Sequence, residues 1–98
     1  MGPPISRVGD IALGHGSFPP TPAIAGSSDV FACGPAVHRK GDAILLHPSP
    51  SPSPPQPRAA SSGSGTVFTN SKPTVRIGDS VDCGGSLAQG CATVLVGG

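Results

Sequence analysis

The sequence predicts an all-β domain of short strands, built from three similar units around a pseudo-threefold axis. The tetrapeptide Arg-x-Gly-Asp occurs at residues 7–10, 39–42 and 76–79. A hexapeptide that begins with glycine and ends in valine and a large apolar residue occurs at residues 26–31, 63–68 and 90–95. Glycine and proline make up 28 of the 98 residues (15 + 13). Because both residues break helices, they favour short strands joined by tight turns.

The elements of one unit follow in a fixed order: a strand, a loop after Arg-x-Gly-Asp, a Gly-Ser corner, a second strand and a tight turn. Residues typical of turns follow the apolar pairs Val30-Phe31 and Val67-Phe68. This pattern predicts strands of four to six residues bounded by chain reversals. The segment Pro4–Arg7 matches Pro73–Arg76. The first unit is therefore expected to open where the last one breaks off.

The length of 98 residues fits a single domain, 1–98, with a small interior. The middle unit contains a stretch rich in proline and serine at 48–57, which can only be extended or polyproline-like. Such a stretch is often a linker or a partner-binding motif. Because it lies inside a repeat, we interpret it as a stiff surface loop. A chain with so little core often needs a metal, a disulfide or a partner subunit.

The composition excludes several classes of protein. Charged residues make up 11% of the chain and the net charge is +1, so no nucleic-acid surface is expected. No transmembrane or signal segment is visible. Three cysteines cannot all pair within one chain, and reduced thiols in a cytoplasmically made chain fit best. Cys33 and Cys91 replace asparagine and serine of the other units, so we interpret both as small buried apolar side chains. Cys91 remains a spare candidate ligand.

A metal ligand follows each Arg-x-Gly-Asp copy at nearly the same distance. His15 lies five residues after Asp10, His47 lies five after Asp42, and Cys83 lies four after Asp79. The repeat phase places all three at equivalent loop tips, although three unrelated polar residues are the alternative. Zinc readily takes tetrahedral nitrogen and sulfur ligands. The sequence therefore predicts one metal per chain held by His15, His47 and Cys83, with zinc favoured and iron the alternative.

The remaining repeated residues are expected to be structural. The glycines Gly9, Gly41 and Gly78 should lie where the backbone needs a positive φ or a close neighbour. Each repeated arginine should hydrogen-bond backbone carbonyls or the aspartate of a neighbouring unit, with an anion site as the alternative. His38 should be a surface or strand-packing histidine. A zinc hydrolase is disfavoured because the chain contains no glutamate that could act as a base.

These motifs together resemble the PAAR-repeat family. The resemblance rests on the Arg-x-Gly-Asp copies, the Gly-Ser-x-x-Val-Phe copies, Gly14–Pro20 and Cys83–Gly85. It implies a small β cone with a sharp vertex and a metal, usually zinc, near that vertex. His15, His47 and Cys83 match the family's ligand positions. The family commonly has one more histidine near the place of Gln56, so the fourth ligand is left open here.

The resemblance also implies a role. Such a cone caps the trimeric β-helical spike of a contractile injection machine, one cap per trimer, and sharpens it for piercing the target-cell envelope. The chain is thus expected to be a structural protein of a phage tail tip, made in the host cytoplasm. A type VI secretion spike is the alternative, followed by a free-standing metal-binding domain or the hydrolase. The flat, apolar base for docking would come from the turns after Val30-Phe31 and Val67-Phe68, together with Val94–Val96.

Overall fold

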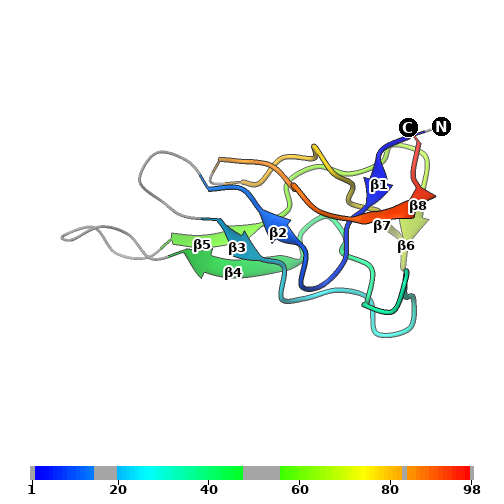
Figure 1. Ribbon diagram of the computed structural model, residues 1–98, viewed down its shortest axis with the longest axis horizontal. Helices are drawn as coiled ribbons and strands as arrows, with labels where there is room; N and C mark the ends of the chain where they lie inside the picture. Colours follow the sequence, from blue (N-terminus) through cyan, green and yellow to red (C-terminus); the bar gives the residue numbers. More distant parts are fainter. Residues whose placement is uncertain (1, 15–19, 48–55, 83, 98) are drawn as a thin grey trace.

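A computed structural model describes residues 2–14, 20–47, 56–82 and 84–97 (Figure 1). At residues 46, 47, 56 and 57 only the backbone is described. The strands are β1 (Pro4–Ile5), β2 (Ile11–Ala12), β3 (Thr21–Pro22), β4 (Ala43–His47), β5 (Gln56–Ala59), β6 (Phe68–Thr69), β7 (Lys72–Pro73) and β8 (Cys91–Leu95). These ranges contain no helix, and therefore none that could span a membrane. The all-β prediction is confirmed.

The strands form four antiparallel two-stranded sheets: β1–β8, β2–β3, β4–β5 and β6–β7. Five strands have only two residues, so the predicted length of four to six holds for β4, β5 and β8 alone. The rest are shorter because the chain leaves each partner quickly to form an isolated bridge with another unit, as at Ile5↔Arg76 and Arg39↔Thr74. The proline- and serine-rich segment also ends earlier than expected, because Gln56 and Pro57 belong to β5.

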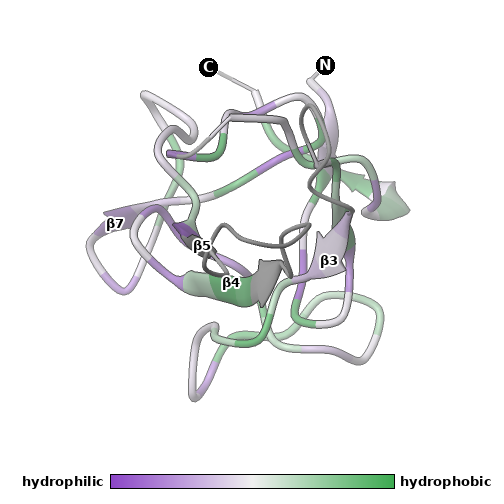
Figure 2. Ribbon diagram, turned by 90° about the vertical axis from the view of Figure 1, so that its left-hand side faces the viewer, coloured by the Kyte–Doolittle hydropathy of each residue, from purple (hydrophilic) through white to green (hydrophobic). Residues whose placement is uncertain are grey.

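The pseudo-threefold axis is visible as a closed ring of backbone hydrogen bonds. The N–H of Ser6 donates to the carbonyl of Val75 (2.9 Å), that of Val75 to His38 (3.1 Å), and that of His38 back to Ser6 (3.0 Å). Each residue of the ring directly precedes an Arg-x-Gly-Asp motif, and all three are fully buried. Viewed along the long axis, the chain winds around this centre (Figure 2). The three units are therefore equivalent in space as well as in sequence.

The third unit is completed by the N-terminal strand. β8 pairs with β1 in antiparallel fashion, with Pro4 opposite Leu95. The N–H of Val96 adds a bond to the carbonyl of Pro3 (2.9 Å). This pairing confirms that the first unit opens where the last breaks off.

The interior consists of two small clusters. The first core cluster comprises Ala12, Ala23, Ile44, Ala60, Val75, Val81 and Leu87. The second core cluster comprises Ile5, Ala32, Val37, Cys91 and Val96, with Val94 packed against it. The side chains are mostly alanine and valine, so each contributes little apolar area. The prediction that Val94–Val96 form part of the apolar docking base is corrected here. Val96 is buried and Val94 is partly buried, so neither is part of an open surface.

The Gly-Ser corners have a clear physical role. The hydroxyl of Ser27 accepts the N–H groups of Asp29 (3.2 Å) and Val30 (2.9 Å). The hydroxyl of Ser64 does the same for Thr66 (3.1 Å) and Val67 (2.9 Å). The serine thus satisfies the backbone donors of a tight corner. Cys91 stands at the corresponding corner of the third unit.

His38 lies deeper than expected, fully buried on the axis. Its Nδ1 is 2.8 Å from the carbonyl oxygen of Ala25, so this nitrogen is the donor, while its Nε2 has no partner among the described residues. Burial lowers the pKa of His38, although the bond to Ala25 opposes the shift. The neutral form is therefore the one that fits the folded chain.

We expect the free energy of unfolding to fall as the pH drops below about 6.5, the ordinary histidine pKa. In this window the unfolded chain gains a proton on His38 that the folded chain binds only at a lower pH, so acid favours unfolding. Urea unfolding at several pH values, compared between the natural chain and His38→Val, isolates this contribution because valine occupies the equivalent position 75. Identical pH slopes in the two chains would contradict it.

Candidate metal centre

Each Arg-x-Gly-Asp copy forms the same clasp. In every copy the arginine Nε donates to one carboxylate oxygen of the aspartate three residues on, at 2.7–3.0 Å, and Nη2 donates to the other. The same carboxylate accepts the backbone N–H of its arginine. Of the two predicted partners, backbone carbonyls are confirmed for Arg39 and Arg76, which also donate to Gly26 and Gly97, whereas an aspartate of a neighbouring unit is wrong. The intervening glycine turns the chain back sharply enough for the motif to close on itself.

The turn glycines and the pKa values agree with this clasp. Gly9, Gly41 and Gly78 have φ angles of 92°, 91° and 93°, which confirms the expected positive φ. The hydrogen bond to its aspartate raises the pKa of each clasp arginine. Burial alone would raise the pKa of Asp42, but the bonds from Arg39 outweigh it and hold that pKa below its usual value. The arginines are thus committed to internal bonds, which disfavours an anion site.

The predicted ligands follow these clasps in the sequence. His47 is the last residue of β4, and its backbone lies opposite Gln56 of β5. His15 and Cys83 lie outside the described residues, as does the side chain of His47. In the part of the chain with described side chains, no three histidine, cysteine or acidic groups are placed to hold a metal ion. The ligand set therefore stays a prediction.

The segments that flank the predicted ligands do converge. The N–H of Leu13 donates to the carbonyl of Ser86 (2.8 Å), and Gly85 lies directly against the carbonyls of Leu13 and Gly14. The hydroxyl of Thr21 donates to the carbonyl of Leu45 (2.6 Å). In Figure 1, hairpins β2–β3 and β4–β5 lie together at this end, which we call the loop end. The backbone therefore brings together the described residues that flank the three predicted ligands, whose imidazole and thiolate groups are of the type that zinc takes.

Sequence reasoning missed Arg58, a buried residue of β5 at the loop end. Its guanidinium donates to the carbonyls of Ala12 and Leu13 and to the hydroxyl of Thr21. Its Nε has no partner among the described residues. One signal was available: Arg58 is the one arginine outside the Arg-x-Gly-Asp copies.

The opposite end carries exposed apolar side chains at equivalent positions of the three units. Phe31 is 60% exposed, Phe68 55% and Leu95 43%, and Val30 and Val67 are exposed beside them. We call these five residues the base surface. Strands β6 and β8, which hold Phe68 and Leu95, lie at the end of the long axis opposite the loop end (Figure 1). The predicted apolar base is thus present, but its apolar side chains come from the Val-Phe pairs rather than from the turns after them, and Val94 and Val96 are not part of it.

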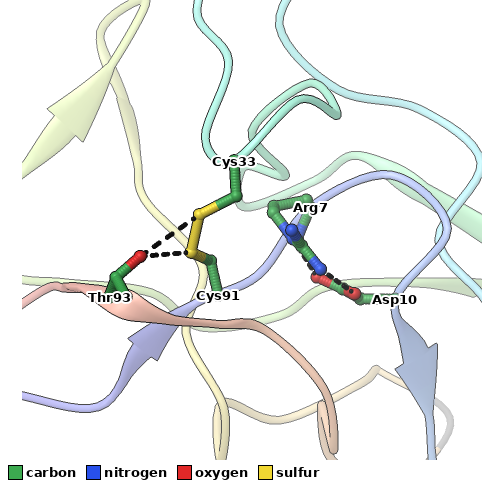
Figure 3. Close-up of a disulfide and its surroundings, with 5 residues drawn as sticks. All are labelled: Arg7, Asp10, Cys33, Cys91 and Thr93. Carbon is green, nitrogen blue, oxygen red and sulfur yellow. Dashed lines mark hydrogen bonds and ion pairs between the residues drawn. A yellow bond between two sulfur atoms is a disulfide. The ribbon is translucent and has the colours of Figure 1, made fainter.

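The base end also contains a disulfide between Cys33 and Cys91, which are 58 residues apart (Figure 3). The hydroxyl of Thr93 contacts the sulfur of Cys91 (3.0 Å) and that of Cys33 (3.5 Å). Two predictions are therefore wrong: these thiols are not reduced, and Cys33 is exposed. Cys91 is buried in the second core cluster, as expected.

Neighbouring units meet at three equivalent contacts at the base end, which we call seams. The disulfide forms one seam, and polar contacts form the other two. Asn70, at the position of Cys33, donates from its amide to Asp29 (2.9 Å) and accepts from Arg39 (3.1 Å). The bond from Asn70 lowers the pKa of Asp29. At the third seam, the hydroxyl of Ser64 donates to the carbonyl of Gly97 (2.6 Å). Chain continuity joins the first unit to the second and the second to the third, and the disulfide joins the third back to the first.

These features define a class of protein: a small β domain with threefold pseudo-symmetry, an apolar base and converging hairpins at the opposite end. The sequence profile of the PAAR motif matches residues 13–89. The chain belongs to the PAAR-motif family, whose members are structural spike-tip proteins of contractile injection systems rather than enzymes. No curated protein matches the chain.

Proposed function

We propose that this chain caps a trimeric β-helical spike, with its base surface on the spike and its loop end towards the target envelope. The observation that carries the proposal is the threefold arrangement of the base surface. Val30-Phe31, Val67-Phe68 and Leu95 occur at corresponding positions of three units around one axis. A trimeric β-helix ends in three equivalent faces, so each unit can meet one spike chain. Burial of the exposed aromatic and aliphatic groups would drive the association.

The proposed metal stiffens the loop end. His15, His47 and Cys83 would hold one zinc ion, with iron the alternative, and the zinc would act as a structural cross-link between the three converging segments. The backbone of Gln56 lies opposite that of His47 in the β4–β5 register. An amide is a weaker zinc donor than imidazole, so we infer that water or a backbone group completes the set.

The mechanical role follows from this construction. The two core clusters contain mostly small side chains, so a cross-link contributes stiffness that core packing alone would not provide. We propose the tail tip of a phage as the location, with a type VI secretion spike as the alternative. Neighbouring genes separate the two machines: capsid genes indicate a phage, whereas membrane-complex genes of a secretion system indicate the alternative.

We expect Leu95→Asp to weaken binding to a trimeric β-helical spike by at least about tenfold, because a carboxylate loses about 1.4 kcal/mol or more on entering an apolar contact. Leu45→Asp is the matched control. Both leucines are 43% exposed, but Leu45 lies in β4 at the loop end. Calorimetric titration of each variant with the spike measures the difference. Equal loss in both variants, or no loss in either, would show that the base surface is not the docking face.

A further inference from the structure

Arg58 is a buried cation held only by neutral oxygens in the described part of the chain. The three ion pairs there all belong to the Arg-x-Gly-Asp clasps. Arg58 instead bonds two carbonyls and one hydroxyl, and the residue as a whole is only 3% exposed. Burying a charge without an opposite charge costs free energy. A residue that stays buried at such a cost is expected to hold something in place.

The bonds of Arg58 fall on both sides of the segment that contains His15. The carbonyls of Ala12 and Leu13 come just before that segment, and Thr21 comes just after it. Thr21 accepts the guanidinium bond (2.8 Å) and passes a bond of its own to the carbonyl of Leu45 (2.6 Å). Leu45 lies two residues before His47 in β4. One side chain therefore ties the first unit to the strand that ends in His47.

Among the described residues, this arrangement occurs in the middle unit alone. Arg58 lies opposite Ile44 in the β4–β5 pair, and Thr21 lies opposite Ala12 at the same position of the β2–β3 pair. The third unit has Gly85 at this place, bonded by its carbonyl to the N–H of Val81 (3.2 Å). The three equivalent positions of the pseudo-threefold axis thus carry a threonine, an arginine and a glycine. Because its side chain is much longer than the other two, Arg58 breaks the threefold symmetry at this position.

We propose that Arg58 is the positioning residue of the metal centre, which rests on the proposed zinc site. Its planar fork bonds the backbone carbonyls just before the His15 segment and the Thr21 hydroxyl just after it, and through Thr21 it reaches Leu45 in β4. Arg58 follows Gln56, the position where this chain lacks an imidazole, by two residues in β5. Its bonds hold the two carbonyls and Leu45 in place before the metal binds.

The test is zinc affinity measured by competition with a chromophoric chelator on the full chain. Arg58→Met is expected to weaken zinc binding about 10- to 100-fold, as loss of an outer-shell partner does. Arg58→Lys should weaken it as well, because it keeps the charge but lacks the fork. Thr21→Val, which removes the bond from Arg58 to residue 21 and the link to Leu45 but keeps the bonds to Ala12 and Leu13, should give a smaller loss and keeps the test open if Arg58→Met fails to fold. Ser64→Ala, at the base end, should leave zinc affinity unchanged.

The outcomes separate the two proposals. If Arg58 only repels the metal by its charge, Arg58→Met would bind zinc more tightly, which would overturn its positioning role. Tight zinc binding by the natural chain, by Arg58→Met and by Thr21→Val alike would overturn that role while leaving the zinc site intact. Absence of zinc binding by the natural chain would overturn both.

Discussion

Removal of the proposed zinc ion is expected to be the largest single loss of stability in this chain. Structural zinc can supply roughly 10 kcal/mol of folding free energy in small domains. The two core clusters here consist mainly of alanine and valine, so little else would offset that loss. Chelation should therefore unfold the loop end or the whole chain. Circular dichroism and thermal melting with and without chelator measure the effect.

The ligand assignment has its own check. Elemental analysis should find one transition metal per chain, and His15→Ala combined with Cys83→Ser should abolish its binding. His38→Ala is the control, because His38 is buried on the axis among backbone groups and is not in the proposed ligand set. Full retention of metal in the double variant, or a natural chain purified with far less than one metal, would rule out this site.

Loss of the disulfide is expected to cost about 4 kcal/mol, because it closes a loop of 58 residues and the entropic stabilisation grows with loop length. The bond joins the third unit to the first, at the ring's otherwise non-covalent closure. Urea unfolding of the oxidised chain and of the chain treated with a phosphine reductant gives the difference. The oxidised chain should unfold at a clearly higher urea concentration.

A matched variant separates the covalent bond from the shape of the side chains. Cys33→Asn with Cys91→Ser installs the residues that the middle unit carries at these positions, Asn70 and Ser64. This variant should unfold where the reduced natural chain does and should not respond to the reductant. If it is as stable as the oxidised chain, the covalent link contributes nothing measurable.

The repeat could be read from the sequence because each motif carries a local physical requirement. A glycine with positive φ lets each Arg-x-Gly-Asp copy close, and a serine caps each of two corners. These requirements act within a few residues, so they leave a regular signature along the chain. The pairing of β8 with β1 could be predicted from the same repeat. The third copy ends before the strand that begins the next unit, and Pro4–Arg7 supplies that strand.

The features that could not be predicted depend on contacts between distant units. Cys33 and Cys91 become neighbours only once the ring has closed, so their spacing of 58 residues gave no indication of pairing. Arg58 stands at a position where the other units carry Thr21 and Gly85, so no repeat marked it. The aspartate partner of each clasp arginine was misassigned. A repeated Arg-x-Gly-Asp motif indicates that arginine and aspartate interact, but it does not show whether they belong to the same copy or to neighbouring copies.

The central claim is that one chain, through its three units, meets all three chains of a spike. Native mass spectrometry of the purified complex with a trimeric β-helical spike tests this most directly. The expected mass equals one copy of this chain plus three spike chains, and the ratio should stay the same when the chain is in excess. Three copies per trimer, or no complex with any trimeric spike, would contradict it.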